Sequence, residues 1–322
     1  MIALIIILCL LGLALLAFLI ACAVLAHFAC GRNDTMENHF ENVLNTFVYR
    51  DYKAKILAAR DWLDAQDTEA VSVTSFDGLR LAGIYLPCEN ARGTLLCFHG
   101  WRGGPVADFG YSAKLYHDLG LNILLVHQRA QGKSEGKHMT FGVRERKDVH
   151  TWVRWHAERF GKDVPILLAG ISMGASTVLM ACGEPFEGDV RGVVADCGYT
   201  SPKEICDVVS RAIRLPPKLF VPVVGLFVRI TAGFSLTEYS TLTAMEKMTL
   251  PVLFAHGEAD NFVPCEMTKR NYKTCASADK TLLLVPGAKH GQSMPVAPEE
   301  YTAAITSLLD RTLGGQHARS ES

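Results

Sequence analysis

The chain has 322 residues, which is enough for one large α/β domain of roughly 240 residues or more. Apolar side chains make up 49% of the residues, enough for a sizeable core, while the 32 basic and 33 acidic side chains leave no broad cationic surface. This charge balance excludes a protein built to bind nucleic acid. The ten cysteines form no C-x-x-C pair and no Cys/His spacing typical of zinc, which favours a reducing compartment.

The first 26 residues contain no charged side chain and are dominated by aliphatic residues. A helix of this length exceeds the roughly 30 Å hydrocarbon core, so we predict a single transmembrane anchor over residues 1–28. The alternative is a cleaved signal peptide, because residues 19–22 resemble a lipoprotein cleavage box. The missing positive charge in front and the apolar continuation behind favour the anchor. Positive charges from Arg32 onward predict that the remaining chain lies on the cytoplasmic side.

Apolar residues recur at near-helical spacing between residues 37 and 66, which predicts a helical stalk within 29–69 that packs on the following domain. An interfacial membrane helix is the alternative, but acidic residues are mixed with the basic ones along this segment. We expect one domain over residues 70–314, followed by a flexible tail at 315–322.

From residue 70 onward, short apolar runs alternate with helical patterns. The predicted strands are a hairpin at 71–74 and 79–86 and runs at 94–98, 122–126, 166–169, 192–195, 252–255 and 281–285. The predicted helices include 107–119, 141–160, 173–182, 265–275 and 298–313. This alternation is typical of an α/β fold with a mainly parallel sheet covered by helices on both faces. Such a sheet carries functional groups in loops at the carboxyl ends of its strands.

The best-defined motif is Gly170-Ile171-Ser172-Met173-Gly174, a G-x-S-x-G sequence between a predicted strand and a predicted helix. A serine on such a sharp turn projects its hydroxyl into the open, and flanking glycines avoid a collision across the turn. Because a serine hydroxyl needs a base to become nucleophilic, the motif requires a partner elsewhere. An ordinary glycine-rich turn with a capping serine is the alternative reading.

Residues 99–104, His-Gly-Trp-Arg-Gly-Gly, follow the strand at 94–98. The backbone N–H groups of such a loop can face a bound carbonyl group. We predict that the N–H groups of Trp101 and Met173 form an oxyanion hole. A plain glycine turn is the alternative.

Two later loops supply a candidate acid and a candidate base. His290 lies between glycines after the last strand, downstream of Ser172, and is the expected general base. Asp260 follows the strand at 252–255 and is the expected acid that orients it. Asp196 and Glu258 are competing candidates for the acid. His99 and His256 also precede glycines at strand ends, where we expect them to hold loops.

The segments 99–101, 131–134, 170–174, 196–201, 256–260 and 287–291 together resemble the α/β-hydrolase superfamily, and in particular its membrane-anchored, single-domain serine hydrolases. The resemblance covers roughly residues 70–313. It implies an eight-stranded sheet and a serine esterase, lipase or thioesterase that uses no metal or organic cofactor. One departure is visible at 127–134, where His-Gln-Arg-Ala-Gln-Gly-Lys-Ser replaces the usual Asp-x-Arg-Gly-x-Gly-x-Ser turn.

The alternation of strands and helices lapses over residues 212–244, which are largely apolar. In the superfamily, an insert after the sixth strand resembles a short cap over the active site. An apolar cap favours an acyl chain or another lipophilic group, and Phe220 and Phe227 are our candidates for contact with it. The alternative is that these residues simply complete the core.

These observations predict a membrane-bound serine hydrolase that cleaves carboxylic esters or thioesters of acyl or other lipophilic small molecules through an acyl-enzyme. Two other functions remain open. The same fold and triad would serve a serine peptidase or an acyltransferase. A binding protein that kept the sheet without catalysis is the other possibility.

Overall fold

The structure, a computed structural model, describes residues 1–32, 44–46 and 48–314. Its eight strands form one sheet in the order β1-β2-β4-β3-β5-β6-β7-β8. The strands are β1 Glu69–Thr74, β2 Arg80–Leu86, β3 Gly93–Phe98, β4 Leu121–Val126, β5 Ile166–Ile171, β6 Val190–Asp196, β7 Val252–Gly257 and β8 Lys280–Val285. Only the pairings β1/β2 and β2/β4 are antiparallel. The predicted α/β fold with an eight-stranded, mainly parallel sheet is therefore confirmed.

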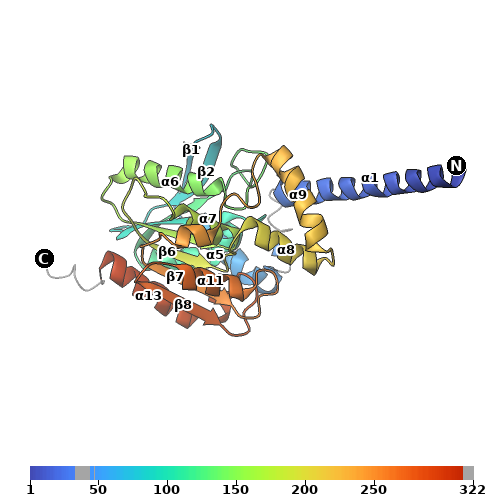
Figure 1. Cartoon of the computed structure of the whole chain (residues 1–322). Coiled ribbons are helices and arrows are strands. Elements are labelled where there is room, and N and C mark those ends of the chain that lie inside the picture. Colours follow the sequence, from blue (N-terminus) through green and yellow to red (C-terminus); the bar gives the residue numbers. More distant parts are fainter. Residues whose placement is uncertain (33–43, 47, 315–322) are drawn as a thin grey trace.

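Helices cover both faces of the sheet (Figure 1). One face packs against α4 (Lys53–Asp64), α5 (Pro105–Asp118) and α13 (Pro298–Leu313). The other packs against α6 (Glu145–Phe160), α7 (Met173–Ala181), α10 (Thr241–Met245) and α11 (Cys265–Thr274). All six residues of β3 are buried, because a central parallel strand has helices on both sides and therefore needs apolar side chains at every position.

Helix α1 (Ile2–Cys30) projects away from the body of the molecule (Figure 1). It is long and apolar enough to cross a bilayer, as predicted. Within the predicted stalk, the structure describes η1 (Arg50–Tyr52) and α4. Residues 33–43 and 47 of the predicted stalk, and the predicted tail at 315–322, lie outside the described residues.

The region after β6 contains α8 (Pro202–Ala212) and α9 (Pro217–Ala232). Periodicity did not predict α9, because apolar residues occur nearly all round it. The structure gives the reason. Val221, Val224 and Val228 are buried, while Leu226 on the opposite side of the helix is exposed and also apolar. Helix α9 crosses α1 where α1 leaves the body (Figure 1). A short helix α12 (Ser293–Val296) precedes α13.

Candidate active site

Ser172 occupies a sharp turn between β5 and α7, with φ 56° and ψ −117°. The glycines of the motif are required by two different contacts. A Cβ on Gly170 would lie 2.3 Å from the carbonyl of Gly174, across the turn. A Cβ on Gly174 would lie 1.7 Å from the carbonyl oxygen of Phe98, so the second glycine permits close packing of α7 on β3. The turn therefore needs glycine on both sides of the serine.

Three loops at the carboxyl ends of β5, β7 and β8 bring Ser172, Asp260 and His290 together. The Nε2 atom of His290 lies 2.9 Å from Oγ of Ser172, and Nδ1 of His290 lies 2.7 Å from Oδ2 of Asp260. All three residues are buried, with exposed fractions between 5% and 8%. In this geometry Nδ1–H donates to the carboxylate, which leaves Nε2 as the acceptor of the serine proton.

The loop after β7 holds Asp260 in an ionised state. Its Oδ1 accepts hydrogen bonds from the backbone N–H groups of Phe262 and Val263, at 2.8 and 2.9 Å. Burial alone would raise the pKa of Asp260, but hydrogen bonds from His256 and His290 outweigh it and hold that pKa well below its usual range. A carboxylate that stays charged can stabilise an imidazolium.

His256 contacts the same carboxylate, which sequence reasoning did not predict. Its Nε2 lies 3.1 Å from Oδ2 of Asp260 and 2.9 Å from the carbonyl oxygen of Val263, and its Nδ1 lies 2.7 Å from Oγ1 of Thr268. The side chain is fully buried. The i, i+4 spacing of His256 and Asp260 around a tight strand-end turn is the signal in the sequence that could have indicated this pair.

The competing candidates for the acid lie elsewhere. Asp196 accepts a hydrogen bond from the hydroxyl of Ser293 at 2.8 Å, and among the described residues it has no hydrogen bond with His290. Burial raises the pKa of Asp196. Glu258 is exposed to solvent. Of the three acids considered, Asp260 is the one in contact with His290.

The two predicted oxyanion donors lie on the loop after β3 and at the start of α7. The N–H of Met173 is at the first position of α7, where a helix leaves its donors free. Across residues 1–32, 44–46 and 48–314, neither this N–H nor that of Trp101 has an acceptor. A Cβ on Gly100 would lie 3.3 Å from Cβ of Ser172, so the loop runs directly beside the serine. Both donors are thus available to a bound oxygen.

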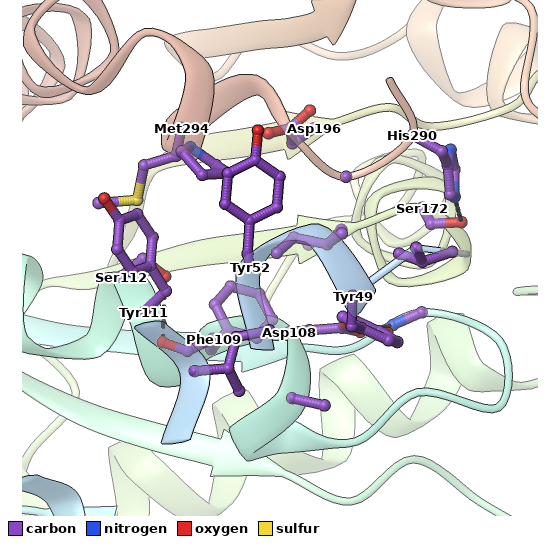
Figure 2. A pocket seen from close by; sticks show the side chains of 18 of the residues that line it. Tyr49, Tyr52, Asp108, Phe109, Tyr111, Ser112, Ser172, Asp196, His290 and Met294 are labelled. Atoms are coloured by element: carbon purple, nitrogen blue, oxygen red, sulfur yellow. Dashed lines mark hydrogen bonds between the residues drawn. The ribbon is translucent and has the colours of Figure 1, made fainter. Parts of the chain in front are cut away.

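Asp108 and Tyr49 support this loop and were missed from the sequence. The N–H of Gly100 donates to Oδ2 of Asp108 at 2.5 Å, and the hydroxyl of Tyr49 donates to Oδ1. Burial raises the pKa of Asp108, since the carboxyl is enclosed beside the cavity that Figure 2 shows. The sequence does contain a signal for Asp108, because an acidic residue in the first turn of a helix directly after a glycine-rich loop can accept hydrogen bonds from the N–H groups of that loop. Tyr49 gave none, because it comes from a distant segment.

Two cavities meet at Ser172. They share three lining residues, namely Trp101, Ser172 and Phe262. The first, here the tyrosine cavity, measures about 150 Å³. Its lining includes Asp108, Asp196 and five tyrosines, namely Tyr49, Tyr52, Tyr111, Tyr116 and Tyr301. Ser172 and His290 lie at the end of this cavity opposite Tyr111 and Met294 (Figure 2).

The second cavity, here the apolar cavity, measures about 290 Å³ and lies between α1, α8 and α9. Its lining is almost entirely apolar and includes Leu25, Phe28, Ile205, Val209, Phe220 and Val224. Phe227, the other predicted contact residue, does not line it. Phe227 lies two turns, or about 10 Å, further along α9 than Phe220 and packs into the apolar cluster around that helix instead.

Ligand atoms of Cys197, Asp260 and His290 lie within 4.8 Å of one another, the one such group of potential metal ligands in the described part of the chain. The carboxylate and the imidazole already bind each other. Burial holds the pKa of the Cys197 thiol well above its usual value, which opposes the thiolate that a metal requires. These three residues fit a proton-transfer site and do not fit a metal site.

Comparison with known proteins gives the following matches. The family model described as serine aminopeptidase, S33, matches residues 220–293, a segment that contains Asp260 and His290 but not Ser172. The protein YqkD of Bacillus subtilis, described as uncharacterized, is 26% identical over 248 residues, which are 77% of this chain and 81% of that protein. Protein bem46 of Schizosaccharomyces pombe is 27% identical over 210 residues, 63% of each chain.

The similar solved structures include the following two. The esterase Pf2001 of Pyrococcus furiosus superposes with a TM-score of 0.62 at 24% identity, covering 78% of this chain and 94% of its own. Est1E of Butyrivibrio proteoclasticus, solved with bound ferulic acid, gives a TM-score of 0.57 at 18% identity, covering 76% of this chain and 99% of its own. The chain therefore has the α/β-hydrolase fold and resembles the serine hydrolases of the α/β-hydrolase superfamily.

Proposed function

We propose that the protein is a membrane-anchored serine hydrolase that cleaves carboxylic esters or thioesters of acyl substrates through an acyl-enzyme on Ser172. The observation that carries this proposal is the continuous hydrogen-bonded chain from Ser172 through His290 to Asp260, at 2.9 and 2.7 Å. A histidine held between a carboxylate and a hydroxyl is the arrangement that turns serine into a nucleophile.

The reaction follows from these contacts. Nε2 of His290 removes the proton from Oγ of Ser172 as Oγ attacks the carbonyl carbon of the substrate. The N–H groups of Trp101 and Met173 bind the resulting oxyanion. The imidazolium, stabilised by Asp260, then gives its proton to the departing alcohol or thiol, which leaves the acyl group on Oγ. Water then attacks the acyl-enzyme while Nε2 of His290 removes a proton from it. The imidazolium returns this proton to Oγ of Ser172 as the carboxylic acid leaves.

The two cavities suit the two halves of such a substrate. The apolar cavity offers almost no polar atom to a ligand, so it favours an acyl chain. The tyrosine cavity carries hydroxyl groups and carboxyl groups, which suit a polar leaving group. Since Ser172 lines both cavities, a substrate that filled both would place its scissile carbonyl beside the nucleophile.

The anchor belongs to the same proposal. We assign residues 1–28 to a transmembrane anchor, residues 29–69 to a stalk and residues 70–314 to the catalytic domain, with 212–244 as a cap. The first basic residue after the apolar segment, Arg32, supports a catalytic domain on the cytoplasmic side.

The test is hydrolysis by the full chain in detergent against matched p-nitrophenyl esters, acyl-thioesters and peptide anilides that carry the same acyl group. We expect ester or thioester turnover to exceed anilide turnover by at least about a hundredfold, because an amide is the harder bond to break. A preference for the anilide would instead favour a peptidase, a class suggested by the matching serine aminopeptidase model and by a solved acylaminoacyl peptidase with a TM-score of 0.57.

A fluorophosphonate probe tests catalysis independently of substrate choice. We expect it to label wild-type protein and to fail on Ser172→Ala protein that retains its far-UV circular dichroism. Absence of labelling in folded wild-type protein, together with no hydrolysis of any substrate, would favour a non-catalytic binding protein.

A further inference from the structure

The last third of α1 is built into the catalytic domain. Cys22, Ala26 and Cys30 are almost fully buried. The indole N–H of Trp101 donates to the carbonyl oxygen of Ala29 at 2.9 Å, so the loop after β3 binds the helix directly. A helix removed as a signal peptide would take these contacts with it.

Arg102 strengthens the same junction. Its guanidinium donates to the carbonyl oxygens of Phe28 and Gly31, at 2.6 and 3.1 Å, and lies over the ring of Phe28. A cation at the C-terminus of a helix satisfies carbonyl groups that the helix leaves free and complements its dipole. The end of α1 is therefore fixed to the loop that supplies the Trp101 N–H.

Helix α1 also supplies one wall of the apolar cavity. Leu25, Phe28 and Ala29 line it, and α8 and α9 form the opposite wall. Ser172 also lines this cavity. Without α1, this space would be an open apolar groove beside the active site.

The free part of α1 matches the thickness of a bilayer. Side chains from Ile2 to Ala21 are exposed except for the half-buried Phe18, and these 20 residues span about 30 Å, the thickness of a hydrocarbon core. Contact with the domain begins where the ring of Phe18 packs against that of Phe220, at 5.0 Å between centroids. Phe220 lines the apolar cavity, so the cavity begins at the level where α1 would leave the membrane.

The outer side of α9 is suited to the membrane surface. Leu219, Leu226 and Ile230 are between 54% and 69% exposed, and Ile213 at the end of α8 is 51% exposed. Exposed basic side chains surround them, namely Arg211, Arg214, Lys218 and Arg229. An apolar face bordered by Lys and Arg is typical of helices that lie in the interface of a bilayer. Since α9 crosses α1 where α1 leaves the body (Figure 1), this face would meet that interface.

From these observations we infer that the apolar cavity takes one acyl chain of a membrane lipid ester, which enters from the bilayer between α1 and the α8–α9 pair. The inference rests on the proposed hydrolase function and extends it by naming the source of the substrate and the role of α1. The acyl chain would lie along Leu25 and Phe28 with its ester carbonyl at Ser172, and the polar head of the lipid would then enter the tyrosine cavity.

The test compares two neighbouring positions of α1 in the full chain reconstituted in phosphatidylcholine nanodiscs. Leu25→Trp fills the apolar cavity, whereas Val24→Trp places the same ring on the 61% exposed side of the helix. Both proteins are assayed with a water-soluble acetyl ester and with a palmitoyl ester of the same alcohol dissolved in the bilayer. We expect Leu25→Trp to lower palmitoyl ester turnover by at least about tenfold relative to acetyl ester turnover, and Val24→Trp to leave this ratio unchanged.

Equal ratios in wild type, Leu25→Trp and Val24→Trp would overturn the inference, as would equal effects of the two substitutions. If the wild type hydrolyses neither ester in a Ser172-dependent way, the proposed function itself has failed. A binding experiment separates these outcomes.

In this experiment, Ser172→Ala protein in nanodiscs is irradiated with a non-hydrolysable ether lipid that carries a diazirine at the end of its alkyl chain.

We expect the diazirine to crosslink to the segment 205–213 as well as to the end of α1, and Leu25→Trp to reduce the crosslinks to 205–213 severalfold. Crosslinks confined to the lipid-facing side chains of residues 2–20 would mean that no chain enters the cavity. Because this readout needs no catalysis, it would overturn the inference even if hydrolysis had been demonstrated.

Discussion

His256 Nε2 lies 3.1 Å from Oδ2 of Asp260, the oxygen that also accepts the hydrogen bond from His290. One carboxylate oxygen thus interacts with two imidazole rings. Removal of His256 would leave Asp260 with one donor fewer and its negative charge less dispersed. We therefore expect His256→Ala to lower kcat about tenfold with KM nearly unchanged, because the carboxylate that orients His290 would be held less firmly.

The matched control for this prediction is Thr268→Val. It removes the partner of the other ring nitrogen of His256 and leaves the contact with Asp260 in place. We expect its kcat to stay within about twofold of the wild-type value. An unchanged kcat in His256→Ala would show that His256 does not position Asp260.

The triad variants have expected magnitudes. Ser172→Ala or His290→Ala should each lower turnover by about four to six powers of ten, and Asp260→Asn by somewhat less, since the members of a triad act as a unit. Asp196→Asn is the control for the acid, because Asp196 is buried close by but hydrogen-bonds to Ser293. Equal losses in Asp260→Asn and Asp196→Asn would contradict the assignment of the acid.

Asp108 should influence the rate of hydrolysis through the loop after β3, which carries Gly100 and Trp101. Its carboxyl accepts from the N–H of Gly100, next to the proposed donor Trp101. We expect Asp108→Ala to lower kcat by about tenfold to a hundredfold, with KM nearly unchanged, since a misplaced oxyanion donor weakens binding of the transition state more than that of the substrate. Asp118→Ala, which removes an exposed acid at the far end of the same helix, should leave kcat within about twofold. A change in KM alone in Asp108→Ala would contradict this role.

Two buried histidines should make the fold sensitive to acid. Burial lowers the pKa of His127 to about 3, helped by the nearby His99 and Lys133, and burial lowers the pKa of His156 to about 4. In the unfolded chain both rings bind protons below about pH 6.5, whereas in the folded chain they remain neutral until pH 4 or 3. The unfolded state therefore binds more protons, and the free energy of unfolding falls as the pH drops from 6.5 towards 3.

Urea unfolding of the detergent-solubilised protein at pH 7.5, 5.5 and 4.5 measures this effect. We expect a progressive fall in the unfolding midpoint and a shallower fall in His127→Leu, in which one of the titrating rings is absent. Identical pH dependence in the variant and the wild type would show that His127 does not contribute. His127 stands where the superfamily's usual turn has an acidic residue, so this sensitivity would be a property of the present sequence.

The sheet and most helices could be predicted because each strand or helix shows its own periodicity. The same reasoning led to Ser172, Asp260 and His290, since parallel strands bring their carboxyl ends to one edge. Other features depend on contacts between distant segments, which no local pattern records. The bond from Trp101 to Ala29 joins residues 72 positions apart, and Tyr49 reaches Asp108 over 59 positions. Helix α9 was not predicted from the sequence, because its side chains are apolar both on the face towards α1 and on the outer face.

The most direct test of the central claim is to trap the acyl group on the nucleophile. The full chain in detergent is mixed with an excess of a p-nitrophenyl ester, quenched in acid within milliseconds and digested for mass spectrometry. We predict a burst of p-nitrophenol close to one equivalent and an acyl adduct on the peptide that contains Ser172, with both absent in Ser172→Ala. Steady hydrolysis with no burst and no adduct on Ser172, or an adduct on another residue, would contradict the account.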